Sequence, residues 1–139
     1  MMKNRTISIA IVTTFAALLL AAFHKAEPTG NTEAEVPAAP AATVGMTNTM
    51  KFTPDTVRIS AGETVEWNNS SLLAHSVTGD PSQSTIQGSA QLPEGADPFD
   101  SGMMDPKETF RHTFNTPGTY QYFCIPHEGA KMYGWVIVE

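Results

Sequence analysis

The chain has a single cysteine, Cys124, and a histidine and a methionine follow it closely. In the closing stretch QYFCIPHEGAKMYGWVIVE, His127 stands three residues after Cys124 and Met132 eight residues after it. A soft thiolate, an imidazole and a thioether together suit copper better than zinc, calcium or magnesium. Such a copper site would also need a second imidazole, and His75, upstream in NNSSLLAHSVTGD, is the candidate.

Each of these four residues has an ordinary structural interpretation when it is considered alone. A lone buried cysteine packs like a small hydrophobic residue, a loop histidine can be a surface residue, and a methionine that starts a strand usually belongs to the core. Their combination, in a chain that we expect to be exported, favours a metal site. The other histidines do not join it, because His24 lies in the N-terminal apolar segment and His112 stands in the middle of FRHTF. Met103 and Met104 are more often core or contact residues than extra ligands.

Length and composition indicate one soluble folded domain and exclude some functions. The chain has 139 residues, of which 41% are hydrophobic and 16% charged, and its formal net charge is −6. Loss of residues 1–25 would remove three basic residues and no acidic one, so the rest of the chain is more acidic still. Nucleic acid is therefore not an expected partner.

The N-terminal segment has the pattern of an export signal. Lys3 and Arg5 precede an apolar run over residues 7–23. We favour cleavage, with an uncleaved membrane anchor as the alternative, because the run is slightly shorter than a typical spanning helix but within the usable range. Lipid attachment is excluded, since it needs a cysteine directly after the run. We therefore expect residues 1–25 to be a signal peptide or signal anchor, and the protein to be periplasmic or otherwise extracytoplasmic.

The rest of the chain divides into a linker and a domain. Residues 26–42 are rich in Ala, Pro and Glu and are expected to form the linker, and residues 43–139 the folded domain. In that domain, apolar residues alternate with polar ones over short stretches that Gly- and Pro-containing turns separate. This pattern predicts an antiparallel β-sandwich or barrel without a convincing helix.

The strand pattern also places the candidate ligands. Cys124 would end one strand and Met132 would start the next, with His127 in the loop between them, so that the three side chains can meet at one end of the sandwich. Because side chains alternate along a strand, Tyr122 is expected to share the core face with Cys124. Phe123 is expected to point outward and to contribute to an aromatic surface.

The stretches MKFTPDTVRISAGETVEWNNSS, AHSV, FDSGMMDPKETFRHTFNTPGTYQYFCIPHEGAKM and GWVIVE resemble, in this order, the cupredoxin family of small blue (type 1) copper proteins. Plastocyanin, pseudoazurin, amicyanin and halocyanin are of this kind. The resemblance covers residues 43–139 and implies an all-β, Greek-key β-sandwich of about seven to eight strands. It also implies one copper ion held by His75, Cys124 and His127, with Met132 as the long axial ligand. Ser76 stands where the family commonly has an asparagine that braces the ligand loop, so this loop is expected to be less well braced.

The resemblance implies a carrier that moves single electrons by Cu(II)/Cu(I) cycling between redox partners outside the cytoplasm. An enzyme is not expected, since this ligand set leaves no position open for a substrate and the sequence has no His-x-His pair for a further copper centre. A cytochrome, an oxidase, a dehydrogenase or a photosystem could be the partner of what we expect to be a monomer. Docking is expected near Leu72, Leu73, Ile125, Pro126 and His127. The alternative is a copper-binding protein for storage, delivery or resistance, and Met103 with Met104 is its one hint.

Overall fold

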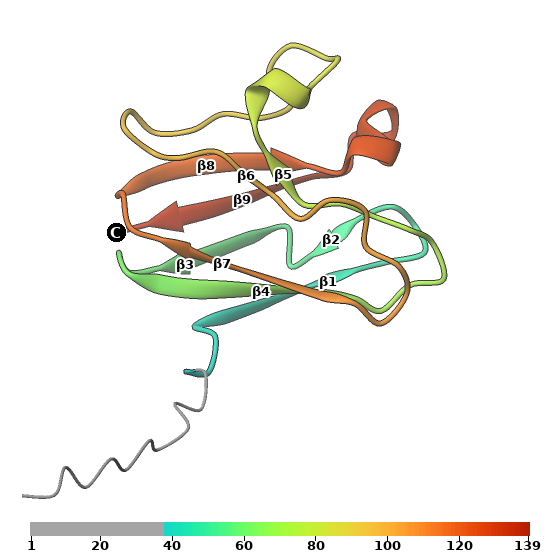
Figure 1. Cartoon of the computed structure of the whole chain (residues 1–139), viewed down its shortest axis with the longest axis horizontal. Helices are drawn as coiled ribbons and strands as arrows, with labels where there is room; N and C mark the ends of the chain where they lie inside the picture. The colour runs from blue at the N-terminus through green and yellow to red at the C-terminus, as the bar shows by residue number, and fades with distance from the viewer. Residues whose placement is uncertain (1–37) are drawn as a thin grey trace, which may run out of the picture. The chain divides into compact units, whose positions relative to one another are not determined.

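The computed structural model describes residues 38–139 of the chain. The predicted signal segment and residues 26–37 of the predicted linker lie outside the described residues. The described part contains nine strands and two short 3-10 helices (Figure 1). The strands are β1 Ala42–Met46, β2 Phe52–Thr53, β3 Thr56–Ile59, β4 Glu63–Asn69, β5 Thr78–Gly79, β6 Phe99–Asp100, β7 Thr109–Phe114, β8 Gly118–Phe123 and β9 Tyr133–Val138; the helices are η1 Pro81–Gln83 and η2 Ile125–Ala130.

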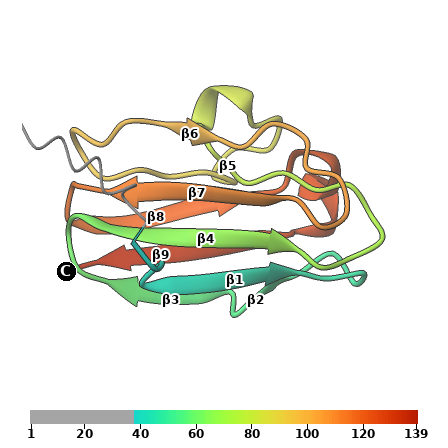
Figure 2. The ribbon, with the colours of Figure 1, turned by 60° about the horizontal axis from the view of Figure 1, so that its bottom comes forward.

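The strands form two sheets, which confirms the predicted all-β sandwich. One sheet has the order β2-β1-β4-β7 and the other β3-β9-β8-β5-β6 (Figure 2). The two sheets are mixed rather than purely antiparallel, because β1 pairs with β4 and β3 pairs with β9 in parallel. The chain crosses to the other sheet between β1 and β4, so these strands become neighbours with the same direction. A period-two pattern shows which residues face the core, but it does not show strand direction.

An aromatic cluster fills the space between the sheets. Trp67 of β4 is fully buried, and its ring lies 5.4 Å from that of Tyr122 on β8 and 6.2 Å from that of Phe114 on β7. Aromatic pairs at these separations stabilise a core beyond the contribution of their buried area. Tyr122 is also fully buried and lies two residues before Cys124, on the same face of β8. The predicted core face of this strand is therefore confirmed, and Cys124 is buried in the same hydrophobic core.

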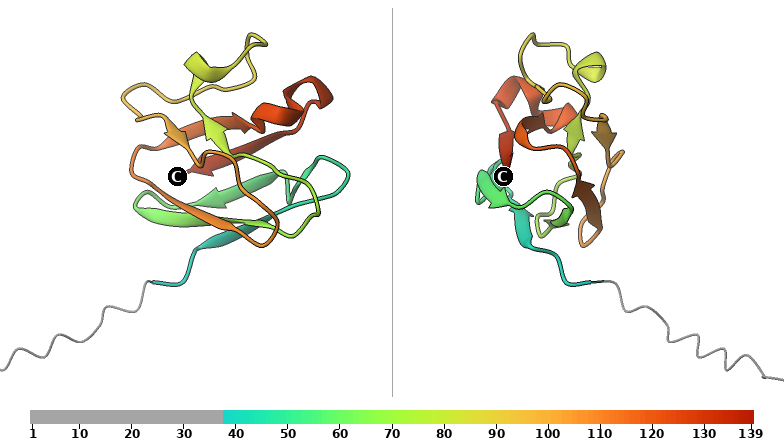
Figure 3. Two further views of the ribbon diagram at one scale, coloured as in Figure 1. Left: turned by 45° about the vertical axis from the view of Figure 1, so that its right-hand side comes forward. Right: turned by 90° about the vertical axis from the view of Figure 1, so that its left-hand side faces the viewer.

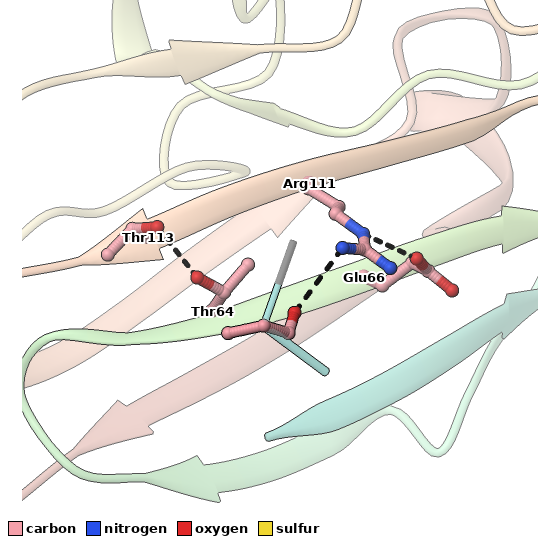
Figure 4. Close-up of polar contacts among 5 residues, drawn as sticks. Thr64, Glu66, Arg111 and Thr113 are labelled. Carbon is pink, nitrogen blue, oxygen red and sulfur yellow. Dashed lines mark hydrogen bonds and ion pairs between the residues drawn. The ribbon is translucent and has the colours of Figure 1, made fainter. Parts of the chain in front are cut away.

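Polar pairs hold the outer face of the β4–β7 pair. The hydroxyl groups of Thr64 and Thr113 lie 2.7 Å apart across the two strands, and the guanidinium of Arg111 bonds to the carboxylate of Glu66 at 2.6 Å (Figure 4). Cross-strand pairs of this kind stabilise sheet register. The same guanidinium donates to the carbonyl of Ala38 at 3.5 Å, which fixes the start of the described chain to this face.

A long excursion, yellow to orange in Figure 3, connects β5 to β6 and pairs with β8 through Gln91 and Gln121. We call its middle part, residues 84–91, the strap. The amide of Gln121 on β8 donates to the carbonyls of Gly88 and Ser89, and the backbones of Gln91 and Gln121 pair in both directions. Phe123 shares the outer face of β8 with Gln121, and it is fully buried. The expectation of an aromatic surface at Phe123 is therefore wrong, because another part of the chain covers that face.

Both ligand-bearing loops lie at one end of the sandwich. Figure 1 shows η2, in the red-orange loop between β8 and β9, at the same end as the loop that leaves β4.

Within residues 38–139, no helix is long and apolar enough to cross a membrane.

Candidate metal centre

Three potential ligand side chains come from different parts of the fold. His75 lies in the loop between β4 and β5, Cys124 directly follows β8, and His127 lies in η2. The backbone N–H of His75 donates to the carbonyl of Met104 at 3.1 Å, and the carbonyl of His75 accepts from the N–H of Met104 at 2.7 Å. The side chain of the buried Asn69 donates to the same carbonyl of Met104 at 2.9 Å. His75 is therefore held by backbone bonds to a segment far away in the sequence.

The donor atoms of these three residues converge. The Sγ of Cys124 lies 3.5 Å from the Nδ1 of His75 and 3.4 Å from the Nδ1 of His127, and the two Nδ1 atoms lie 3.1 Å apart. A point equidistant from all three, in their common plane, lies about 2 Å from each, a typical length for a bond from a metal ion to nitrogen or sulfur. The arrangement of one thiolate and two imidazoles therefore fits a trigonal copper centre.

Met132 lies next to this cluster. Its carbonyl accepts a hydrogen bond from the N–H of Cys124 at 3.1 Å, and its own N–H donates to the carbonyl of His127 at 3.4 Å. The side chain is fully buried, directly before β9. These backbone bonds therefore hold Met132 beside Cys124 and His127.

Ser76 connects the two ligand-bearing loops. Its backbone N–H donates to the Sγ of Cys124 at 3.3 Å, and its hydroxyl accepts from the N–H of Ile125 at 2.8 Å. The same hydroxyl lies 3.1 Å from that of Thr78, which in turn donates to Asp100 at 2.9 Å. The serine side chain, although shorter than asparagine, thus reaches the ligand loop, where Ser76 and Thr78 are both fully buried. This is contrary to the expectation of a less well braced loop.

A further brace, which the sequence analysis missed, comes from Glu128. Its carboxylate is 5% exposed and accepts hydrogen bonds from the hydroxyls of Ser84 and Thr85, both at 2.6 Å, and from the N–H groups of Thr85 and Ile86, both at 3.1 Å. Burial acts to raise the pKa of Glu128, but hydrogen bonds from Ser84, Thr85, Ser89 and Ile86 outweigh it and lower the pKa to about 2. A single acidic residue in a loop gives no sequence signal of such contacts.

The electrostatics of the ligands suit metal binding. Burial lowers the pKa of His75, the positive charge on His127 lowers it further, and the backbone of Thr47 opposes both effects. His75 is therefore neutral near pH 7, which is the form that binds a metal. Burial raises the pKa of the Cys124 thiol, and hydrogen bonds from Ser76 and His127 partly offset this. Metal binding at this site therefore has to displace the thiol proton.

The remaining candidate residues lie away from the cluster. His112 is half-buried on β7, where its ring stacks on that of Phe99 at 4.5 Å, so it is a core-edge residue. Met103 is 56% exposed, whereas Met104 is 3% exposed and belongs to the hydrophobic core. The two methionines therefore do not form a shared ligand pair. His24 lies outside the described residues.

Comparison with known proteins identifies the family. The family model described as copper binding proteins, plastocyanin/azurin family, matches residues 39–139. Amicyanin from Paracoccus versutus is 40% identical over 106 residues, 76% of this chain and 70% of that protein, and plastocyanin from Scenedesmus fuscus is 36% identical over 88 residues, 63% of this chain and 86% of that protein. The chain covers 58% of the longer chloroplastic plastocyanin of Tetradesmus obliquus.

Solved structures agree with this result. The crystal structure of amicyanin from Paracoccus versutus is similar with a TM-score of 0.55 at 39% identity, over 76% of this chain and 87% of that one. A pseudoazurin from Sinorhizobium meliltoi has the same TM-score at 27% identity, over 70% of this chain and 72% of that one. The chain therefore belongs to the plastocyanin/azurin family of copper binding proteins, and its cofactor is copper.

Proposed function

We propose that this protein is a type 1 copper electron carrier, in which His75, Cys124, His127 and Met132 would hold the copper ion. The observation that carries the proposal is the convergence of one Sγ and two Nδ1 atoms within 3.5 Å of one another. The ion would supply one-electron chemistry by cycling between Cu(II) and Cu(I), because this ligand set fully suits neither oxidation state.

The protein's own contribution is to hold the ligands rigidly and to keep water away. Cys124, His75 and Met132 are fully buried, and only His127 is partly exposed. Ser76 and Glu128 fix the ligand loop from opposite sides through hydrogen bonds to separate segments. A rigid, dry site with one exposed imidazole edge favours electron transfer over substrate chemistry, which needs an open ligand position.

The surface around His127 supports a docking role. Five large hydrophobic residues are exposed among residues 38–139, and all of them lie in a ligand-bearing loop or in a segment that contacts such a loop. Their exposed fractions are 83% for Leu72, 38% for Leu73, 44% for Ile86, 56% for Met103 and 39% for Ile125. An apolar surface of this kind is typical of a protein-binding site. We infer that Leu72, Leu73, Ile125, Pro126 and the edge of His127 form the docking patch for a redox protein.

The proposed place of action is outside the cytoplasm. The apolar N-terminal run in the sequence supports export, and the single cysteine lies at the copper site rather than in a disulfide. Docking through a single patch suits a monomer that meets its partners one at a time. A cleaved signal peptide remains the favoured interpretation of residues 1–25.

The second candidate function, copper storage or delivery, has less support in the structure. A delivery protein would present soft ligands on its surface for exchange, but Met104 is buried in the core and three of the four proposed ligands are fully buried. A buried site releases its ion slowly, which suits a carrier that keeps its cofactor.

The test is the visible spectrum of the protein after one equivalent of Cu(II). We expect an intense thiolate-to-copper absorption band at about 600 nm, which ascorbate bleaches reversibly. Cys124→Ser and His75→Gln should abolish the band, and His112→Gln should keep it, because His112 lies away from the cluster. Binding of Cu(I) without any blue species would instead favour copper delivery and would refute the carrier.

A further inference from the structure

The carboxylate of Glu128 is the feature of the ligand loop that the proposed copper chemistry does not use. It follows the proposed ligand His127 directly, and it is nearly inaccessible to solvent. Four hydrogen bonds reach it from Ser84, Thr85 and Ile86 in the strap, and each carboxylate oxygen accepts two of them. Charge-assisted bonds of this length are among the stronger hydrogen bonds in proteins.

The strap is itself fixed to the sheet, so it is a firm anchor for Glu128. The Gln121 side chain on β8 bonds to the strap carbonyls of Gly88 and Ser89, and the hydroxyl of Ser89 donates to that of Tyr133 on β9 at 3.2 Å. Gln91 ends the strap with two backbone hydrogen bonds to Gln121. Through Glu128, the ligand loop is thus connected to the strands on both sides of it.

Glu128 and Ser76 hold the ligand loop on either side of His127. On one side, the N–H of Ile125 is bound to Ser76, and on the other side Glu128 is bound to the strap. Between these two points, the backbone of His127 is held by its N–H bond to Cys124 at 3.1 Å and by a longer contact from Met132 at 3.4 Å. On the same side, the N–H of Lys131 bonds to the carbonyls of Glu128 and His127. These backbone bonds close the loop into a turn, and the side chain of Glu128 attaches this turn to the strap.

We propose that Glu128 is a positioning residue for His127. Its attachment to Ser84, Thr85 and Ile86 fixes the ligand loop on the strap and keeps the Nδ1 of His127 directed at the Sγ of Cys124 and the Nδ1 of His75. This role rests on the proposed copper-carrier function. The strap contains no ligand, but by this proposal it belongs to the hydrogen-bonded support that limits movement of the ligands between the two oxidation states.

The test compares Glu128→Gln with Glu94→Gln in the copper-loaded protein. Glu94 is exposed in the same excursion, so the two variants change the net charge equally, but only the first weakens the attachment. Cu(II) affinity by competition titration and the electron self-exchange rate constant by NMR line broadening are the measurements. We expect Glu128→Gln to lower one or both by about ten- to hundred-fold, the usual effect of removing a residue that orients a ligand, while Glu94→Gln resembles the wild type.

A second variant tests the attachment without a change of charge. Ser84→Ala with Thr85→Val removes two donors to Glu128, so it should reproduce the effect of Glu128→Gln. Adding both changes to Glu128→Gln should then have little further effect, because the residues act as one unit. The milder Ser84→Ala serves if the combined variant does not fold.

Wild-type affinity and wild-type self-exchange in both sets of variants would overturn the proposal, even if their melting temperatures fall, because Glu128 would then only stabilise the fold. Failure of the copper-carrier function itself would show in the unaltered protein, as the absence of a blue band with Cu(II). The two failures are therefore distinguishable.

Discussion

The hydroxyl of Ser76 accepts a hydrogen bond from the backbone N–H of Ile125 at 2.8 Å, and so connects the loop of one histidine to the loop of the other. The proton of this hydroxyl is free to bond to Thr78, which donates onward to the carboxylate of Asp100. The serine therefore acts as one member of a chain of hydrogen bonds that ends on a charged group.

Ser76→Ala should destabilise the metal-free protein by about 1–3 kcal/mol, because the N–H of Ile125 would lose its acceptor in a buried setting. Urea unfolding of the metal-free protein measures this change. Ser82→Ala is the matched control, since Ser82 is exposed and bonds only to Asp80 near the surface. Equal unfolding free energies for the two variants would contradict a bracing role for Ser76.

Leu73→Glu should slow electron transfer to a redox partner without a change in the visible spectrum. Leu73 is 38% exposed in the proposed docking patch, and a carboxylate there would have to lose water when a partner docks on the apolar surface. Stopped-flow kinetics with a soluble c-type cytochrome as the test partner measure the rate. Thr119→Glu, an exposed change near the start of β8, should leave that rate close to the wild-type value. Equal slowing by both variants would indicate a general charge effect instead of a patch.

His112 should make the metal-free protein less stable in mild acid. Burial lowers the pKa of His112 below its ordinary value of 6.5, although the negative charge of Asp97 opposes this. A histidine with a lowered pKa binds a proton more readily in the unfolded state, so its contribution to stability is complete above about pH 6.5 and is lost as the pH falls toward the folded-state pKa.

His112→Phe should therefore show a smaller loss of unfolding free energy between pH 7.5 and pH 5 than the wild type. The phenyl ring can keep the stack on Phe99. Urea titrations of the metal-free protein at both pH values provide the comparison, and His75 contributes equally to both proteins. The same pH dependence in variant and wild type would exclude His112 as a source of acid sensitivity.

Gly134→Ala should destabilise the protein by about 1–3 kcal/mol, because overpacking a filled core costs that much. A Cβ at this position of β9 would overlap the ring of Tyr122, which is fully buried. Gly129→Ala in η2 is the control, since a Cβ there meets no atom within 4 Å. Thermal unfolding followed by circular dichroism gives both values. A wild-type melting temperature for Gly134→Ala would mean that Tyr122 can shift.

Local pattern was sufficient to predict most of the fold and two of the three clustered side chains. Alternation identified β4, β7, β8 and β9, and the close spacing of Cys124 and His127 placed them between two adjacent strands. His75 was a harder case, because it was chosen only as the second imidazole that a copper site needs, and its position depends on backbone bonds to Met104.

The remaining features depend on contacts between segments that are distant in the sequence. The strands β5 and β6 have two residues each, too few for an alternating pattern. Alternation correctly directed Phe123 to the outer face of β8, but it could not show that the strap covers this face. Glu128 was missed for the same reason, since its donors lie more than 40 residues upstream.

The burial of Phe123 would limit how the proposed carrier exchanges electrons. The side chain next to Cys124 on its strand ends beneath the strap, whereas His127 reaches the surface. The electron donor and the electron acceptor would then share one route through His127, and the two proteins would compete for the same docking site. Such a carrier cannot be reduced by one partner while it remains bound to the other, so each delivery requires complete release and a new encounter. Its turnover would therefore be governed by dissociation as much as by the electron-transfer step, and tighter binding to either partner would slow the overall flow.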